Sequence, residues 1–282
     1  MTLKLGYCGW LLAGKSLPDV IDFLEKEGFC SVSWLQNIMT ADPVERQEAA
    51  AAIREKNFLL HYHGNVQGKL TADCKLDEDF AKRMFDDVIW WHENTNGVIS
   101  CCSDNISAVL PGEDKSTFLE AETFRLFQME SVAFEPYGIG YGIENSCGPY
   151  GSLTLMEKFR NNAGDAPHAG MIMDVGHAYI HATQHYPGMS LAEYLQAIPF
   201  RFCEMHITDN HGTRDEHLIP GEGTLDFSQL RAAADALDYQ GVYSLEVCKD
   251  ICNGLYSWDL NDPADADCIK LARDRFIKAM GA

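Results

Sequence analysis

Short apolar runs alternate with longer amphipathic stretches along the whole chain, and eight of these runs are predicted to be β-strands. They are near-continuous apolar segments, which is typical of parallel strands covered by helices on both faces. The predicted strands are Leu3–Trp10, Cys30–Leu35, Asn57–His63, Gly97–Ser103, Ile139–Asn145, Gly170–Val175, Phe200–Thr208 and Val242–Val247.

The stretches between the strands have the spacing of helices with one apolar face. Leu230, Ala234 and Leu237, for example, step by four and three residues and therefore share one side of a helix. The predicted helices are Ser16–Glu27, Pro43–Lys56, Asp77–Asn94, Lys115–Phe134, Ser152–Asn162, Ser190–Ile198, Asp226–Tyr239 and Pro263–Met280.

Eight strand–helix units in a row predict an α/β fold: a single closed (β/α)₈ barrel of parallel strands that occupies residues 1–282 as one domain. An open doubly wound sheet stays as the alternative, because alternation alone does not require closure. The usual fingerprint of that sheet is GxGxxG after the first strand. It is absent here, where the sequence is Gly6-Tyr7-Cys8-Gly9-Trp10.

The chain is acidic, with 42 Asp and Glu against 22 Lys and Arg and a formal net charge of −20. Such a charge argues against nucleic acid or an anionic membrane as a partner, because both require clustered basic residues. We find neither a signal peptide nor a run of about 18 apolar residues, so we expect a cytoplasmic protein without a membrane span. Its ten cysteines, which form no CxxC pair, are then expected to be buried free thiols.

The last four predicted strands end in a set of polar residues, namely Glu144, Asp174, His206 and Glu246. In a (β/α)₈ barrel such positions meet at one rim, where active sites lie. A lone acid at a strand end is commonly a helix N-cap or an ion-pair partner. Three acids and an imidazole together, however, would repel and desolvate one another unless a cation held them. The set therefore predicts a divalent metal site, and its chemistry suits Mn²⁺, Mg²⁺, Co²⁺ or Zn²⁺.

A second group of polar residues is expected beside this rim. His177 follows Asp174 by three residues, and the loop after His206 carries Asp215 and His217. We interpret His177, Asp215 and His217 as a second metal site or a substrate clamp, with a solvated loop as the alternative.

Several other positions near the rim allow both a functional and a structural interpretation. His63, at the end of the third strand, is either a functional residue or a hydrogen-bonded core histidine. Trp10 and Trp34 end the first two strands and would wall a sugar pocket, with plain packing as the alternative. The vicinal Cys101-Cys102 pair fits a buried strand better than a redox site.

These motifs resemble those of the xylose-isomerase-like TIM barrels, a family of sugar isomerases and epimerases with endonuclease IV as a sister branch. The resemblance covers the whole chain in architecture, and its motifs lie in the second half. They are Ile143–Ser146, Met173–His177, His206–Asp209, Asp215–Gly223 and Leu245–Glu246. In the epimerase branch, the resemblance implies that His177 touches the substrate and that one divalent metal is held by Glu144, Asp174, His206 and Glu246.

The nuclease branch carries a trinuclear zinc centre instead. The resemblance would assign its additional sites to His63, His177, Asp215 and His217. Where that branch has a histidine at the end of strand four, this sequence has Ser100-Cys101-Cys102-Ser103. The missing histidine and the net charge of −20 argue against a nuclease. The presence of Asp215 and His217 favours a nuclease. A cysteine is itself a zinc ligand, so the departure leaves such a centre open.

We therefore predict an enzyme, a metal-dependent isomerase or epimerase that acts on a sugar or polyol. The cation would polarise the substrate and stabilise an enediolate, while Glu144 and Glu246, one ionised and one protonated, would transfer the proton. His177, His63 and Arg214 would bind substrate hydroxyls. A dehydratase acting on a cyclic polyol is a close variant, and a multinuclear phosphodiesterase and a non-catalytic binding barrel are the rivals. The sequence leaves open whether the chain forms a homo-oligomer.

Overall fold

The computed structural model describes residues 3–34, 42–64, 76–103, 115–145 and 151–282. Eight parallel strands in these residues are hydrogen-bonded in the order β1-β3-β4-β5-β6-β7-β8-β9 and close into a barrel. The closed barrel confirms the predicted fold and excludes the open doubly wound sheet. Its strands are β1 (Lys4–Cys8), β3 (Ser31–Trp34), β4 (Leu59–Gly64), β5 (Val98–Ser103), β6 (Gly140–Glu144), β7 (Ala169–Asp174), β8 (Phe202–Ile207) and β9 (Val242–Leu245).

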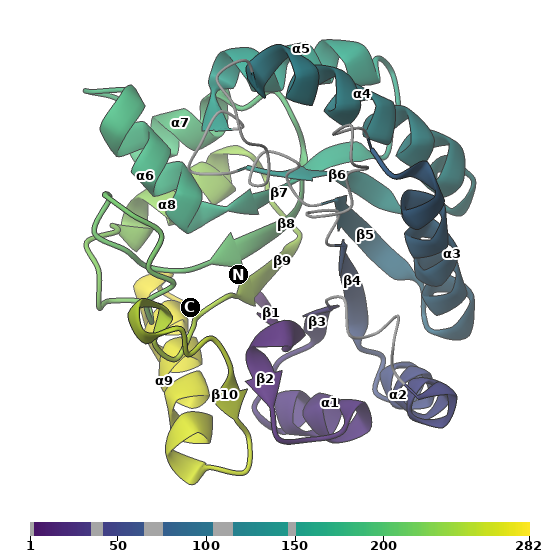
Figure 1. Cartoon of the computed structure of the whole chain (residues 1–282). Coiled ribbons are helices and arrows are strands. Elements are labelled where there is room, and N and C mark those ends of the chain that lie inside the picture. The colour runs from purple at the N-terminus through teal and green to yellow at the C-terminus, as the bar shows by residue number, and fades with distance from the viewer. Residues whose placement is uncertain (1–2, 35–41, 65–75, 104–114, 146–150) are drawn as a thin grey trace.

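Helices surround this barrel on the outside (Figure 1). Every predicted helix is present, with ends that differ from the prediction by at most three residues. Within the described residues, we find no helix that combines the length and the apolar character needed to cross a bilayer. The α-helices are α1 (Leu17–Lys26), α2 (Pro43–Glu55), α3 (Glu78–Asn94), α4 (Lys115–Phe134), α5 (Leu153–Ala163), α6 (Val175–His185), α7 (Leu191–Ala197), α8 (Phe227–Ala236) and α9 (Pro263–Ala279).

Helix α6 is an element that the sequence pattern did not predict. It begins directly at the end of β7, where Asp174 is both the last strand residue and the N-cap of the helix. The Asp174 side chain accepts a hydrogen bond from the His177 backbone N–H at 2.6 Å, which fixes the first turn. Gly176 lets the segment after β8 pack against this turn, because a Cβ there would lie 2.0 Å from Thr208 Oγ1. No loop separates strand from helix, so no run of turn residues marks the boundary in the sequence.

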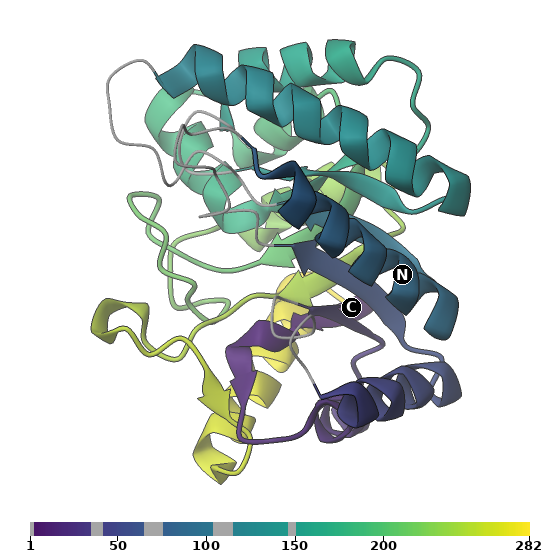
Figure 2. The ribbon, with the colours of Figure 1, turned by 45° about the vertical axis from the view of Figure 1, so that its right-hand side comes forward.

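The first strand is shorter than predicted. It ends at Cys8, and Gly9–Leu11 form the 3₁₀ helix η1, so Trp10 lies beyond the strand. The next residues form β2 (Leu12–Ala13), which pairs in parallel with β10 (Trp258–Asp259) as a small sheet separate from the barrel. Figure 2 shows this pair beside the yellow-green segment that projects from the barrel after β9. The small sheet thus joins the segments that follow the first and last barrel strands.

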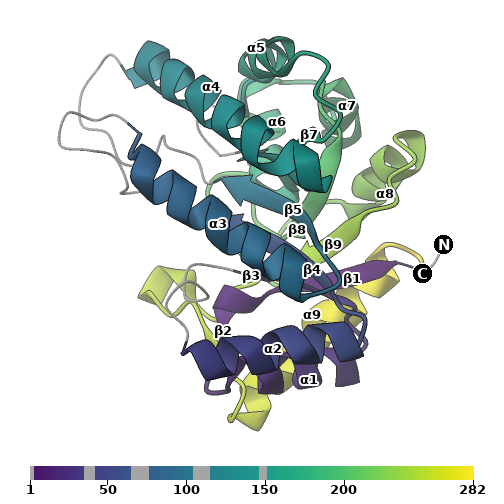
Figure 3. The ribbon, with the colours of Figure 1, turned by 90° about the vertical axis from the view of Figure 1, so that its right-hand side faces the viewer.

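The outer face of the barrel packs against the helices, and Figure 3 shows α3 and α4 running along one flank of it. Tyr62, on β4, is buried there and donates its hydroxyl to Asp87 of α3 at 2.9 Å. Asp87 also forms an ion pair with Arg46 of α2. The buried Tyr62 hydroxyl and the Asp87 carboxyl are therefore both paired, as such positions require.

Every second residue of a strand points into the barrel, so the inward side chains form successive levels. The two levels nearest the carboxyl ends of the strands carry polar side chains. Strand pairing sets neighbours at the upper level, where His63 is opposite Cys102 and Asp174 is opposite His206. One step below lies a second polar level, made of Ser33, His61, Ser100, Glu204 and Ser244.

Candidate metal centre

The four residues predicted as metal ligands lie together at the rim of the barrel. Glu144 ends β6, Asp174 ends β7, His206 lies on β8 and Glu246 directly follows β9. Each offers a ligand atom within 4.8 Å of the others, and all four side chains are buried. His206 Nδ1 lies 3.0 Å from Glu144 Oε1 and 3.2 Å from Glu246 Oε2. The convergence on which the sequence prediction depends is therefore present in the structure.

The remaining oxygen of each glutamate is engaged by an aromatic ring nitrogen. Glu144 Oε2 lies 3.1 Å from His63 Nε2, and Glu246 Oε1 accepts a hydrogen bond from Trp10 Nε1 at 3.2 Å. His63 also stacks on His206, with the ring centroids 5.4 Å apart. His63 and Trp10, both singled out in the sequence, thus each contact a member of the four-residue set.

The pKa of each glutamate is lowered in this arrangement. Burial raises the pKa of Glu144, but the hydrogen bonds and charges of His206 and His63 outweigh it and hold this pKa well below the usual range. Burial likewise raises the pKa of Glu246, and His206 brings it below its ordinary value. The sequence predicted one ionised and one protonated carboxyl for this pair. That expectation stays a prediction for the enzyme with a cation and a substrate bound, whereas in the chain alone the imidazole lies against both carboxylates.

Asp174 is the carboxyl that resists ionisation. Burial raises its pKa to about 7, and the charges of Glu246 and Glu144 add to this effect while His177 opposes it. Its Oδ1 caps α6, whereas its buried Oδ2 has no hydrogen-bond partner in the described structure. A buried carboxylate oxygen without a partner, close to two other anions, is costly unless a cation compensates it.

These donors fit a divalent cation. Three carboxylates and one imidazole are the hard and borderline ligands that Mn²⁺, Mg²⁺, Co²⁺ and Zn²⁺ accept. The orphaned Oδ2 of Asp174 would become a ligand without the loss of any hydrogen bond. That the four residues bind a cation nevertheless stays a prediction.

The second predicted group also comes together, at the rim beside the first. Asp215 Oδ2 lies 3.1 Å from His177 Nε2 and 2.9 Å from His217 Nε2. The other ring nitrogen of each histidine faces a backbone carbonyl, that of Asn145 at 2.8 Å for His177 and that of Glu246 at 2.7 Å for His217. His217 has a left-handed backbone, with φ of 48°, which a non-glycine residue adopts only at some cost.

The charge balance of this second group differs from that of the first. Burial lowers the pKa of His217, but Asp215 outweighs burial and raises it to about 10. Burial raises the pKa of Asp215, and its contacts with His177 and His217 bring it far below its usual value. One carboxylate thus faces two imidazoles, and both a second cation and a substrate clamp at this group stay predictions.

Two cysteine thiols lie closer to the site than the sequence analysis indicated. Cys102 has its Sγ within 4.8 Å of ligand atoms on His63 and Glu144, and Cys8 is equally close to His206 and Glu246. Both thiols are buried. The signal for Cys102 was present in the sequence, because it is the inward residue of β5 that pairs with His63.

For two other predicted substrate-binding residues, Arg214 and Trp34, the structure does not show whether they reach a substrate. The Arg214 guanidinium donates from Nε and Nη2 to Glu216 Oε1, both at 3.1 Å, so it has a carboxylate partner on its own loop. The side chain of Trp34 lies outside the described part of the structure. Substrate contact by either residue stays a prediction.

The loop after β8 is organised by Asp209, a residue that the sequence analysis left without a role. Its Oδ2 accepts backbone N–H bonds from Gly221 and Gly223 at 2.8 and 3.0 Å. Its Oδ1 accepts from Leu225 at 3.1 Å and from Asn210 at 2.8 Å. A Cβ at Gly223 would lie 2.3 Å from Asp209 Oδ1, so glycine is required for this close approach.

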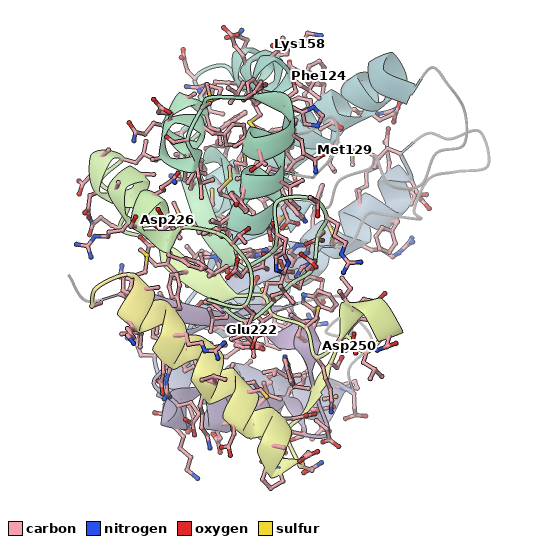
Figure 4. All side chains as sticks on the ribbon, turned by 90° about the vertical axis from the view of Figure 1, so that its left-hand side faces the viewer. Phe124, Met129, Lys158, Glu222, Asp226 and Asp250 are labelled. Atoms are coloured by element: carbon pink, nitrogen blue, oxygen red, sulfur yellow. The ribbon has the colours of Figure 1, made fainter. Side chains whose placement is uncertain are left out.

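The same loop also contacts the outer helices. Figure 4 shows Glu222 beside α9, with which it is linked by the ion pair from Arg275 Nη1 at 3.1 Å. Asp226, labelled in the same view, caps α8 by accepting the Ser228 backbone N–H. The loop that carries Asp215 and His217 is therefore anchored both inside and outside the barrel.

Comparison with known proteins identifies the family. Residues 21–270 match the family model described as xylose isomerase-like TIM barrel. The chain belongs to this family. A curated relative, the uncharacterized protein MJ1311 of Methanocaldococcus jannaschii, is 34% identical over 136 residues. This match covers 46% of the chain and 44% of the relative, so the chain spans less than half the length of that protein.

Several solved structures of similar shape are named as sugar epimerases. D-allulose 3-epimerase from Methylomonas sp. has a TM-score of 0.73 at 18% identity, with 99% of this chain and 98% of that chain covered. The 3-keto-D-glucoside 4-epimerase YcjR from E. coli has a TM-score of 0.70 at 17% identity, covering 97% and 100%. The IOLI protein, solved with a zinc atom, has a TM-score of 0.70 at 14% identity, covering 99% and 98%. At these identities the likeness shows the fold alone.

Proposed function

We propose that this chain is a cation-dependent epimerase or isomerase that moves a proton on a sugar or polyol. The observation that carries the proposal is the arrangement of Glu144 and Glu246. Each is buried, with one oxygen beside His206 Nδ1 and the other held by a ring nitrogen, and these contacts lower the pKa of both carboxyls. The substrate class is taken from the structurally similar proteins, whose names are those of sugar epimerases.

The four converging residues Glu144, Asp174, His206 and Glu246 would hold the cation. When bound, it would act as a Lewis acid that polarises a carbonyl group of the substrate. The remaining work belongs to the side chains of the protein. His177 and His63 would orient substrate hydroxyls, since His177 lies at the rim and His63 already contacts Glu144.

The two ionised glutamates would invert a carbon in a balanced cycle. One takes the C–H proton next to the carbonyl, and the other takes the proton of the hydroxyl on the same carbon. The second glutamate then delivers its proton to the opposite face of that carbon, and the first returns its own to the hydroxyl oxygen. Both carboxylates end ionised, as they began. A positioned acid or base of this kind contributes ~10²–10⁴ in rate.

Closely related chemistry requires the same residues. Return of the proton to the neighbouring carbon would give isomerisation. Departure of a β-hydroxyl after the first proton transfer would give dehydration of a cyclic polyol. Both begin with proton removal by a carboxylate next to a carbonyl, so both would exchange a substrate hydrogen with solvent.

The test is deuterium exchange. Ketoses, aldoses and inososes are incubated with the protein and Mg²⁺ in D₂O, and NMR follows the loss of single C–H signals. Glu246→Gln should fold and lose exchange by ~10²-fold or more, because the base is gone. Glu222→Gln makes the same replacement at an exposed rim glutamate and should keep the wild-type rate. Undiminished exchange in Glu246→Gln would remove Glu246 from the mechanism, and exchange of any sugar would exclude a non-catalytic binding barrel.

The alternative is a multinuclear phosphodiesterase, and a specific observation favours it. Three further donor groups share residues with the four-residue set or lie beside it, namely Cys8 with His206 and Glu246, His63 with Cys102 and Glu144, and His177 with Asp215 and His217. Several adjacent cations of this kind would activate water for attack on a phosphodiester. Metal analysis separates the two functions. One tight cation per chain together with deuterium exchange supports the epimerase, whereas three cations with hydrolysis of a model phosphodiester and no exchange support the alternative.

A further inference from the structure

Below the candidate metal centre, the inside of the barrel is polar. The interior of such barrels is usually filled by bulky branched aliphatic side chains. Here the level beneath the rim has a buried carboxylate, Glu204, whose exposed fraction is 1%. Around it are buried small or polar side chains from other strands, namely Ser33, His61, Ser100 and Ser244.

Glu204 is held by neutral donors and histidines. Ser244 Oγ donates to its Oε1, and Ser33 Oγ donates to its Oε2 at 3.3 Å. His61 Nδ1 lies 3.4 Å from Oε2 and 2.8 Å from Ser100 Oγ. Within the described residues, its ion-pair partners are His61 and His206, and no lysine or arginine is among them. A buried anion without a strong cationic partner costs stability, so its presence calls for a role.

The ring of His206 separates Glu204 from the rim carboxylates. Its Nδ1 faces Glu144 and Glu246. Its Nε2 is buried without a hydrogen-bond partner in the described residues, and Glu204 Oε2 lies 3.6 Å from it, just beyond hydrogen-bond distance. An imidazole that binds a cation through one nitrogen must carry its proton on the other. A cation bound at Nδ1 therefore requires a proton on Nε2, and that proton needs an acceptor on the side where Glu204 lies. The Cys8 thiol also lies beside this ring and is the competing neighbour.

We propose that Glu204 is a positioning residue for the cation site: it holds the Nε2 proton of His206 and thereby presents the Nδ1 lone pair to the cation. Ser33 and Ser244 in turn hold the Glu204 carboxylate in place. In many metal sites a carboxylate accepts a hydrogen bond from the second ring nitrogen of a metal-binding histidine, and this bond fixes the orientation and the tautomer of the ring. The inference rests on the cation proposed above, but it does not depend on which substrate is processed.

The test uses the whole chain labelled with ¹⁵N-histidine and loaded with ¹¹³Cd²⁺. Scalar coupling between cadmium and nitrogen identifies the coordinating nitrogen, and the proton-bearing nitrogen is identified from its N–H signal. In the wild type we expect the coupling at Nδ1 of His206 and the proton at Nε2. Glu204→Gln should weaken cadmium binding by ~10–100-fold, the usual effect of losing such a partner. Glu204→Asp should restore part of it, because the carboxylate is retained.

Two matched variants distinguish this role from plain packing. Ser33→Ala removes one donor to Glu204 and should give a smaller loss of affinity than Glu204→Gln. Cys8→Ala removes the competing neighbour and should leave the proton on Nε2. Cadmium coupling to Nε2 in the wild type, or an unchanged affinity in Glu204→Gln, would overturn the proposal even if that variant were less stable.

The outcome is separable from that of the epimerase proposal. A chain that binds no cadmium would overturn both the cation and the role of Glu204. A chain that shows the Nδ1 coupling but exchanges no sugar hydrogen would keep the positioning role and overturn only the sugar chemistry.

Discussion

The two halves of the barrel supply different chemistry to the same rim. Strands β6 to β9 and the residue after β9 bring three carboxylates and one imidazole, from Glu144, Asp174, His206 and Glu246. Strands β1, β4 and β5 bring two thiols and one imidazole, from Cys8, His63 and Cys102. The second half therefore carries the carboxylates that require a cation, and the first half carries an imidazole and two thiols whose ligand atoms lie within 4.8 Å of members of that set.

This difference suggests a division of labour. The carboxylates of the second half should decide whether a cation binds at all, because charge compensation is the main contribution to binding at such a site. The softer donors of the first half should decide which cation is preferred, because thiolate favours zinc over magnesium. The comparison can be tested from either side.

The largest effect is expected from the acidic half. Glu144→Gln removes one carboxylate from the set and should lower the affinity for Mg²⁺ and Zn²⁺ by ~100-fold or more, since loss even of an outer partner costs 10–100-fold. Isothermal titration with metal-stripped protein measures this. The matched variant from the other half is Cys102→Ser, which should leave Mg²⁺ affinity within about threefold. Equal losses in the two variants would contradict the division.

Asp174→Asn should have opposite effects on stability with and without cation. The folded-state pKa of Asp174 is raised to about 7 from 3.8, so the folded chain loses stability as pH rises through this interval. Asn avoids that loss and keeps a cap oxygen for α6. At pH 8 without cation we expect the variant to be more stable by about 1–3 kcal/mol, with no difference at pH 4.

Urea denaturation at both pH values measures this difference. With saturating Mg²⁺ the order should reverse, because only the wild type gains stability from a bound cation. If Asp174→Asn is less stable than the wild type at pH 8 in a chelating buffer, the ionised Asp174 carboxyl does not destabilise the fold.

Metal preference should shift when the first half is changed. Cys102→Ser replaces a soft donor that lies within 4.8 Å of ligand atoms on His63 and Glu144. We expect zinc affinity to fall by roughly tenfold while magnesium affinity stays constant. Competition between the protein and a chromogenic chelator for zinc measures the zinc affinity. A constant ratio of zinc to magnesium affinity would mean that the thiol takes no part.

The smallest effect is expected at Arg214. Its guanidinium is paired with Glu216 on the same loop, and the side chain is 64% exposed. Arg214→Ala should change the free energy of unfolding by no more than about 0.5 kcal/mol, as for other exposed pairs. The KM for any exchanged sugar should stay within about twofold. A large increase in KM at constant stability would support the substrate contact that the sequence predicts for Arg214.

The barrel and the meeting of its four polar strand ends were predictable from the sequence for a simple reason. Parallel strands covered by helices leave a regular apolar pattern, and the closed topology places every strand end at one rim. Glu144 and Asp174 are far apart in sequence, yet the alternation of strands and helices is enough to bring them together. The missed helix α6 had no such signal, because Asp174 ends the strand and caps the helix at once.

What the sequence did not reveal depends on contacts across the barrel. Glu204 is a plain strand residue in the sequence, and its position behind His206 follows only from the inward side chains of five strands. The lowered pKa of both glutamates depends on one imidazole that lies against both of them. Distances of this kind decide proton positions, and a pattern of residue types does not contain them.

The Asp209 carboxylate, with its four backbone donors, has a consequence for recognition. It ties down the loop that carries Asp215 and His217 before any ligand arrives. The amide hydrogens of Gly221, Gly223 and Leu225 should therefore exchange slowly with solvent in the free protein. A molecule that binds at this side of the rim contacts a loop that is already ordered. Its binding should therefore cost little conformational entropy of the loop.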